Sequence, residues 1–241
     1  MSVRTVARNG RGLDEQRQSG RRSLARLLTA TGQAHEHTIA AGSLIAREGT
    51  RPAEVSVVTA GLLELSRHVG ARRVTVDLVH PGEAFGDIEI LTGGERTSDV
   101  RALVPSRLLS VDVAAFLRLL STNTTAGFRW LLDLAERVAL ADARLGERAT
   151  ASLESRLALV LLGENRGGEV ALTQTTLGGL LGVHRSSVNR GLKHLAAREL
   201  ITAGYGRIRI LDRAGLEGVA EAGTGPEHPE PSPRTPSSPA R

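Results

Sequence analysis

Residues 172–197 carry side chains whose types and spacing suit contact with nucleic acid. Leucines in the first half of this stretch recur at helical spacing, Thr173 is placed to cap that helix, and Gly182 is placed to end it. In the second half, one face continues the apolar pattern, while the opposite face carries cations, an amide and a hydroxyl, and no acid. The residues of that polar face are Arg185, Ser186, Asn189, Arg190 and Lys193. Two helices joined at a glycine, the second presenting Arg and Asn, are typical of a helix-turn-helix, although an ordinary hairpin with a solvated basic face is the alternative.

A second group, in the stretch 82–98, has the composition of a phosphate site. A glycine lets the backbone turn into one helical turn whose N–H groups could face an anion, and a guanidinium and two hydroxyls follow. A carboxylate in the same stretch could accept a hydrogen bond from a sugar hydroxyl. The residues that supply these groups are Gly86, Asp87, Arg96, Thr97 and Ser98. All are common loop residues, so an ordinary connection is the alternative.

A third pattern, His35-Glu36-His37, is the alternation that places two imidazoles on one face of a strand, as in metal-binding barrels. No third His or Glu follows within a few residues, because the chain continues Thr-Ile-Ala-Ala-Gly. We therefore interpret the pair as surface histidines, and predict neither a metal site nor an enzyme. A small metal-dependent, cupin-like barrel enzyme is the alternative from another class, and a pure ligand-binding or interaction module is a third interpretation.

Composition narrows the classes of protein. The 241 residues are 40% hydrophobic, enough for two modest cores, and the absence of cysteine excludes disulfides and iron–sulfur ligation by thiolates. The net charge is +5, and the arginine excess is concentrated in residues 1–26 and 173–213, where attraction to phosphate would be useful. No apolar run approaches the ~20 residues of a membrane span, and the arginine-rich start lacks the apolar core of a secretory signal, so we expect a cytoplasmic protein with no membrane contact.

The pattern of apolar residues and turns changes several times along the chain. From His37 to Val111, short apolar runs alternate with glycine-bearing turns, which is the pattern of a compact antiparallel barrel or sandwich. After the helix pair, two strands around residues 203–206 predict a wing, with Arg207 and Arg209 on one of its faces. We place the segments at 1–22 (disordered basic arm), 23–121 (barrel), 122–150 (long helix), 151–213 (winged helix-turn-helix) and 214–241 (short helix and disordered Pro-rich tail).

The long helix has a three-then-four apolar spacing, which is that of a coiled-coil seam. Its members are Phe128, Leu131, Ala135, Val138, Asp142, Leu145 and Ala149. The seam predicts a parallel homodimer through Phe128 to Leu145. An aspartate at a seam position is costly unless it is paired, hydrated or contacted by a ligand, and the residues leave these three explanations open.

In this order, the barrel, the short helix followed by Arg-Thr-Ser, the seam helix and the winged helix-turn-helix resemble the cyclic-AMP receptor protein and FNR (Crp/Fnr) family of bacterial transcription regulators. The likeness covers about residues 35–213, and its most specific parts are PGEAFGD at 81–87, ERTS at 95–98, LTQ at 172–174 and VHRSSVNR at 183–190. It implies an α+β fold with an N-terminal cyclic-nucleotide-binding-like β-roll (a double-stranded β-helix, or jelly roll), a dimerisation helix and a C-terminal winged helix-turn-helix. It also implies a homodimer on a palindromic operator in double-stranded DNA, with RNA polymerase as a further partner.

The resemblance and the charge of the exposed faces together assign roles to residues. Base contacts fall to Arg185, Ser186, Asn189 and Arg190, and phosphate contacts to Thr173, Gln174, Ser187, Lys193 and Arg207. The effector would be held by Gly86, Asp87, Arg96, Thr97, Ser98, Arg137 and Asp142.

Several departures from the family pattern bear on the effector and the operator. Asp87 stands where cyclic-AMP-responsive members usually carry Glu, and the gap from Gly86 to Arg96 is slightly short. Asp142 stands where those members place an adenine-contacting hydroxyl, and its carboxylate could pair with guanine or accept from the amino group of adenine. The candidate effectors are therefore cyclic AMP, cyclic GMP and cyclic di-GMP, and a ligand-independent regulator with a degenerate site is the alternative. Ser186 stands where members that read the familiar cyclic-AMP receptor site usually carry Glu, so we expect this protein to read a different operator.

Overall fold

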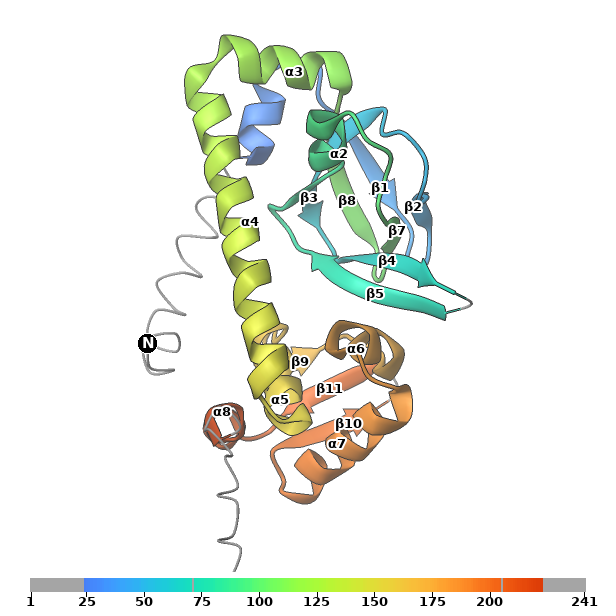
Figure 1. The fold of residues 1–241 in the computed structure, drawn as a ribbon, viewed down its shortest axis with the longest axis vertical. Helices are drawn as coiled ribbons and strands as arrows, with labels where there is room; N and C mark the ends of the chain where they lie inside the picture. Colours follow the sequence, from blue (N-terminus) through green and yellow to red (C-terminus); the bar gives the residue numbers. More distant parts are fainter. Residues whose placement is uncertain (1–23, 71, 205, 223–241) are drawn as a thin grey trace, which may run out of the picture.

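The computed structural model describes residues 24–70, 72–204 and 206–222. The fold is α+β, as the sequence predicts: a β-roll, a long helix and a helix-turn-helix unit with a small sheet follow one another along the chain (Figure 1). The predicted disordered arm, 1–22, and the Pro-rich part of the predicted tail lie outside the described residues. Within the described ranges, no helix combines the length and the apolar content needed to cross a membrane.

The β-roll consists of two four-stranded antiparallel sheets. The first sheet has the order β1 (His35–Ile39), β8 (Ser106–Asp112), β3 (Glu54–Ala60), β6 (Ala84–Phe85), and the second has the order β2 (Leu44–Ala46), β7 (Asp99–Ala102), β4 (Leu63–Val69), β5 (Arg72–Val79). These strands coincide with the predicted apolar runs, except that β6 is too short to show a period of two.

Alternation along β3 and β8 divides the apolar residues of the roll between two cores. Val57 and Leu109 face the helices and pack with Phe116 and Trp130. Their neighbours on the opposite face pack against the second sheet around Phe85. The roll therefore offers one apolar face to the helices and keeps the other for its own interior.

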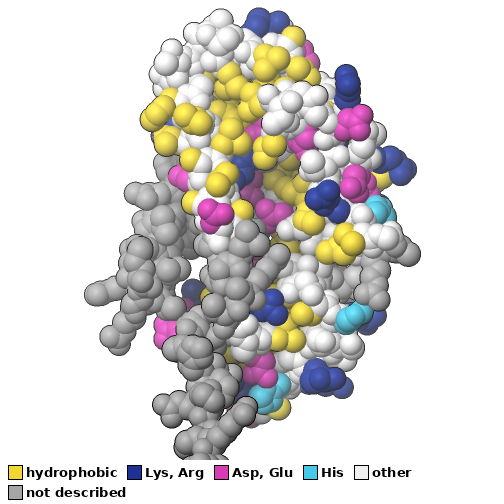
Figure 2. All heavy atoms as spheres, viewed as in Figure 1, with side chains coloured by type: hydrophobic (Ala, Val, Ile, Leu, Met, Phe, Trp, Pro, Cys, Tyr) yellow, Lys and Arg dark blue, Asp and Glu magenta, His cyan; other side chains and the backbone are white. Residues whose placement is uncertain are grey.

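The long helix α4 (Thr124–Thr150) has two apolar faces. It follows α3 (Val113–Thr122), and Trp130, 1% exposed, fixes its inner face to the roll. The predicted seam is exposed in the single chain: Phe128 and Leu131 are each 60% exposed, and Val138 is 63% exposed. Figure 2 shows hydrophobic side chains gathered along the upper part of this helix. Exposed apolar stripes of this kind are typical of surfaces that bind another molecule.

The C-terminal unit is built from short helices and a three-stranded sheet. Its elements are α5 (Leu153–Gly163), β9 (Glu169–Val170), α6 (Gln174–Leu181), α7 (Arg185–Ala197), β10 (Ile201–Gly204), β11 (Arg207–Ile210) and α8 (Arg213–Ala222). The Thr173 hydroxyl accepts from the Thr176 N–H at 3.1 Å, and Gly182 ends α6 with a φ of 67°. Both predicted helix boundaries are thus confirmed. Strand β9 extends the predicted wing hairpin to the order β10-β11-β9.

The C-terminal unit docks directly on the β4–β5 hairpin. A Cβ built on Gly179 of α6 would lie 2.5 Å from the backbone nitrogen of Thr75 on β5, so only glycine permits this approach. Leu78 of β5 is buried in the same apolar core as α5, α6 and α7. The position of the helix-turn-helix relative to the roll is therefore set by a packed contact, in addition to the covalent connection through α4 and α5.

Candidate functional site

Helix α7 presents the predicted base-reading residues on its open face. Val188, Leu192 and Leu195 are buried in the core of the C-terminal unit. On the other side, Arg185, Ser186, Arg190 and Lys193 are exposed, and Ser187 and Asn189 are half-buried. The helix contains no acidic residue. This face can approach DNA without like-charge repulsion from its own side chains.

The N-termini of α6 and α7 lie side by side. Arg185 Nε donates to Gln174 Oε1 at 3.4 Å. Arg185, a candidate for base contact, is therefore next to Gln174, a candidate for phosphate contact. Thr173 is exposed, but its hydroxyl already serves as the cap of α6. Its place at the first turn, where free backbone N–H groups and the helix dipole favour an anion, suits a DNA phosphate.

The wing carries two arginines on one face, as the sequence predicts. Arg207 and Arg209 are exposed on β11, with Ile208 buried between them. Both contact Glu169 of β9, at 3.9 Å and 3.2 Å. Exposed ion pairs of this kind contribute little stability, so a DNA phosphate can replace Glu169. The sequence did not reveal this carboxylate, because a two-residue strand has no detectable period.

Asp87 is the most constrained of the predicted effector residues. Helix α2 (Asp87–Thr92) begins at Gly86, whose φ of 84° and ψ of −11° favour glycine. Asp87 is 1% exposed, and its Oδ2 accepts from Trp130 Nε1 at 2.8 Å while its Oδ1 accepts from Arg137 Nη1 at 3.3 Å. Arg137 Nη2 also donates to Oδ2. The carboxylate therefore joins the β-roll to two donors of α4.

Arg137 lies between carboxylates. Its Nε is 2.9 Å from Asp133 Oδ2, an ion-pair contact without hydrogen-bond alignment. Burial lowers the pKa of the Arg137 guanidinium, but the hydrogen bond to Asp87 and the charges of Asp87, Asp133 and Glu83 outweigh burial and raise this pKa above its usual value. Burial raises the pKa of Asp133 to about 6, against the opposing charge of Arg137. Arg137 is therefore a permanent cation in this group.

Arg96 lies next to the glycine that starts α2. Its Cζ is 5.9 Å from the centroid of the Phe85 ring, and a Cβ built on Gly86 would lie 3.3 Å from Arg96 Nη1. Burial lowers the pKa of the guanidinium, against the opposing charges of Glu89 and Glu54. Among the residues that the structure describes, no carboxylate is in ion-pair contact with Arg96. A partly dehydrated cation in this position is suited to an anionic ligand.

The two predicted hydroxyl donors, Thr97 and Ser98, differ in their surroundings. The N–H and the hydroxyl of Thr97 both lie 3.4 Å from Oε1 of Glu89, while Ser98 is 5% exposed. Glu89 presents to Thr97 the kind of acceptor that a phosphate would present. The sequence did not single out Glu89, because the contact depends on how α2 folds back over the loop.

The fold brings most of the predicted effector residues into one region and adds Trp130. Asp142, by contrast, is exposed on α4 in the single chain. The seam pattern does not include Trp130, because Trp130 lies on the other face of α4. A second stripe at helical spacing, formed by Ala126, Trp130, Leu134 and Arg137, runs along the face that packs on the roll, and it was detectable in the sequence.

His80 connects the roll to the C-terminal unit. Its Nε2 is 2.8 Å from Oε2 of Glu164, just after α5, and its Nδ1 is 3.3 Å from Oε2 of Glu83. Burial lowers the pKa of His80, but the hydrogen bonds and charges of Glu164 and Glu83 outweigh burial and raise it to about 9. The imidazolium therefore donates to a carboxylate from each of its nitrogens at neutral pH, which strengthens the docked arrangement.

Comparison with known proteins agrees with this architecture. The family described as Cyclic nucleotide-binding domain matches residues 36–123, and the family described as Crp-like helix-turn-helix domain matches residues 155–219. The HTH-type transcriptional regulator Cmr of Mycobacterium tuberculosis is 38% identical over 167 residues, which are 69% of this chain and 68% of the relative. The Cyclic AMP receptor protein of Thermus thermophilus is 30% identical over 183 residues, 74% of this chain and 85% of the relative. A solved CRP/FNR-family transcriptional regulator, also from Thermus thermophilus, has a TM-score of 0.65 at 26% identity, covering 78% of this chain and 100% of that chain.

Proposed function

The chain belongs to the Crp/Fnr family of DNA-binding transcription regulators, and on that premise we propose that it acts as a homodimer that reads a palindromic operator with one α7 helix from each subunit. The observation that carries this proposal is the open, acid-free polar face of α7. Arg185 and Arg190 can each bind guanine bidentately, and Asn189 can bind adenine in the same way. Ser186 discriminates poorly between bases, so we assign the reading of the operator mainly to the other three.

The substitution Arg185→Ala tests this assignment. We expect a loss of about 1–3 kcal/mol of binding free energy per half-site, together with relaxed preference at one base pair of each half-site. The measurement is a salt-matched titration of operator DNA and of variants altered at single base pairs. Arg198→Ala, an exposed cation just after the other end of α7, is the matched control and leaves the preference unchanged. Unchanged affinity and preference in Arg185→Ala would contradict the role of Arg185.

The dimer is proposed to form through the seam of α4. Three of its side chains, Phe128, Leu131 and Val138, are at least 60% exposed in the single chain, which is unfavourable for large apolar groups unless a partner covers them. A parallel pairing of two seams places the two α7 helices on one side of the dimer, as half-sites about 34 Å apart require. RNA polymerase is the further partner that family membership suggests.

We further propose that the β-roll binds a nucleotide effector through its phosphate, with Arg96 as the main cation. Support comes from the partial dehydration of Arg96 and from Glu89, whose carboxylate occupies the acceptor position in front of Thr97. Gly86 and Ser98 complete this group. Cyclic AMP, cyclic GMP and cyclic di-GMP are the candidate effectors, and one relative is named a cyclic AMP receptor protein.

One observation favours the alternative, a regulator that acts without an effector. Asp87 already bonds to Trp130 and Arg137, so the connection between the roll and α4 is complete within the chain itself. In this arrangement the Asp87 carboxylate accepts hydrogen bonds from α4 in place of a hydrogen bond from a ribose hydroxyl. Asp142 is exposed on α4 in the single chain, so it needs no ligand to satisfy its carboxylate there.

Calorimetric titration with each of the three cyclic nucleotides separates the two proposals. If the roll binds an effector, one nucleotide gives saturable heat, and Arg96→Gln weakens its binding by about 10–100-fold because a charge-assisted hydrogen bond to phosphate is lost. Arg129→Gln, at an exposed position of α4, is the control and leaves the titration unchanged. Absence of heat with all three nucleotides would contradict effector binding and support ligand-independent action.

A further inference from the structure

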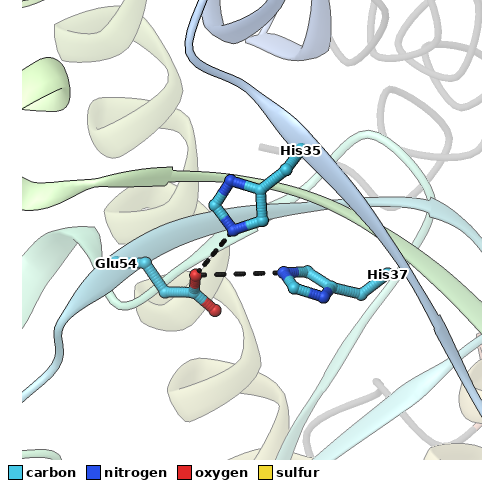
Figure 3. Close-up of side chains that lie close together, drawn as sticks. All are labelled: His35, His37 and Glu54. Carbon is cyan, nitrogen blue, oxygen red and sulfur yellow. Dashed lines mark hydrogen bonds and ion pairs between the residues drawn. The ribbon is translucent and has the colours of Figure 1, made fainter.

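A third cluster of chemically active side chains lies away from both α7 and Arg137, on the sheet that contains β1, β8 and β3. His35 and His37 of β1 and Glu54, the first residue of β3, each offer one ligand atom, and these atoms lie within 4.8 Å of one another (Figure 3). Elsewhere in the described part of the chain, no other three His, Asp or Glu side chains converge in this way. Glu54 thus supplies the third ligand group, which is missing from the sequence around His35 and His37.

The strand register explains why these side chains meet. His35 pairs with Ser110 of β8, and Ser110 pairs in turn with Ser56 of β3, so the three residues share one face of the sheet. Glu54 stands two positions before Ser56 and therefore points to the same face. Strand β8 separates β1 from β3, and Glu54 is 19 residues from His35 in the chain, which hides the group from any local pattern.

The spacing of the ligand atoms suits a small cation. His35 Nε2 lies 3.2 Å from Glu54 Oε2, and His37 Nε2 lies 4.0 Å from the same oxygen. Both rings direct Nε2 toward the carboxylate (Figure 3). Two ligands of a tetrahedral zinc ion are about 3.3 Å apart, since each lies about 2.0–2.1 Å from the metal. The first pair is already at this separation, and the second requires a movement of under about 1 Å. All three ligand atoms, the pair from the two histidines included, lie within 4.8 Å of one another, so side-chain rotation of about 1–2 Å brings them to the zinc geometry.

His37 supplies an independent indication. Its Nε2 is buried and has no hydrogen-bond partner among the described residues. Buried polar atoms in native proteins nearly always have a partner, and a bound ion is one of the few explanations for an exception. The three side chains are nevertheless 36–49% exposed as a whole, so an ion can enter from solvent without movement of the backbone.

We propose that His35, His37 and Glu54 bind one divalent transition-metal ion, with Zn²⁺ the best fit. Two imidazoles and one carboxylate form an established three-ligand set for zinc, with water in the fourth position, and imidazole ligands disfavour Mg²⁺ and Ca²⁺. The ion joins β1 to β3 across β8.

Other histidine–carboxylate contacts in the structure lack this convergence. His68 has one carboxylate neighbour, Glu48, with Nδ1 to Oε2 at 3.8 Å. His80 has two, but Glu83 and Glu164 lie at opposite ring nitrogens, so all three cannot bind one ion. His68→Gln is therefore a matched control, because it removes an exposed histidine beside a glutamate without touching the proposed site.

The test is a Zn²⁺ titration of the untagged full-length protein in competition with a chromophoric chelator. We expect one Zn²⁺ per chain with a dissociation constant in the micromolar range or tighter. His37→Gln and Glu54→Gln should each weaken Zn²⁺ binding at least about 100-fold. Removing a side chain that binds the metal directly weakens binding more than removing a side chain that only supports such a ligand. His68→Gln and Glu36→Gln, the latter on the other face of β1, should leave the affinity unchanged.

Two outcomes would overturn the proposal: no stoichiometric Zn²⁺ binding by the unmodified protein, or equal affinity in His37→Gln and the unmodified protein. The variants are expected to fold, since each of the three side chains is more than a third exposed. Circular dichroism in the presence of chelator checks this. His35→Gln provides a second ligand variant if one of the others is destabilised.

Discussion

Replacing Leu131 with aspartate is expected to convert the protein into a monomer and to weaken its binding to a palindromic operator by about 10²–10⁴-fold. Leu131 is 60% exposed in the single chain, so the new carboxylate is solvated there and the subunit keeps its fold. In the paired seam, two carboxylates would face each other in an apolar contact, which is strongly unfavourable. Operator affinity falls because the two half-sites are then bound by separate molecules.

Sedimentation of the Leu131→Asp variant measures the association state, and a salt-matched operator titration measures the affinity. Leu117→Asp makes the same chemical change at a 43% exposed position of α3, outside the seam, and should remain dimeric with normal affinity. If Leu131→Asp sediments as a dimer, the seam of α4 is not the interface.

Replacing Arg137 with methionine is expected to lower the free energy of unfolding by about 3–5 kcal/mol. Methionine keeps the length of the side chain but removes the cation that faces Asp87 and Asp133. Asp87 is 1% exposed, and among the described residues only Trp130 would still donate a side-chain hydrogen bond to its carboxylate. A buried carboxylate that loses its counter-charge is costly, whereas an intact buried pair contributes little net stability.

Urea unfolding followed by circular dichroism measures this loss, and the fluorescence of Trp130, the single tryptophan, reports on the site itself. Arg129→Met removes an exposed cation from the same helix and should change stability by no more than about 0.5 kcal/mol. In a double-mutant cycle with Asp87→Asn, the coupling energy should be about 0.5–3 kcal/mol. Equal stability of Arg137→Met and Arg129→Met would contradict a structural role for the link between the roll and α4.

The substitutions at Leu131 and Arg137 address the two faces of one helix. The outer face of α4 pairs subunits in the proposed dimer, while the inner face holds the roll through Trp130 and Arg137. Docking of Gly179 against Thr75 and of His80 against Glu164 then connects the same roll to the helix-turn-helix. The roll is therefore connected to the C-terminal unit in two ways, through α4 and through the β4–β5 hairpin.

Much of the fold was predictable from local sequence features. The caps at Thr173 and Gly182, the turn at Gly86 and the amphipathic face of α7 depend on side chains within one or two helical turns. Short-range preferences of this kind can be read without knowing the tertiary structure. The strands β6 and β9 escaped prediction because two residues have no period, and with β9 the wing partner Glu169 escaped as well.

By itself, the sequence determined the order of the elements, the polar face of α7 that we propose meets DNA, and the apolar stripe of α4, because each depends on spacing along the chain. Only the tertiary structure decided which charged groups meet: Asp87 with Arg137, Glu89 with Thr97, and Glu54 with the two histidines of β1. These partners come from different elements, or from opposite ends of a loop, so strand register and helix docking set their distances. Buried and half-buried charges are the groups whose chemistry depends most on such neighbours, because low solvation makes each nearby charge count.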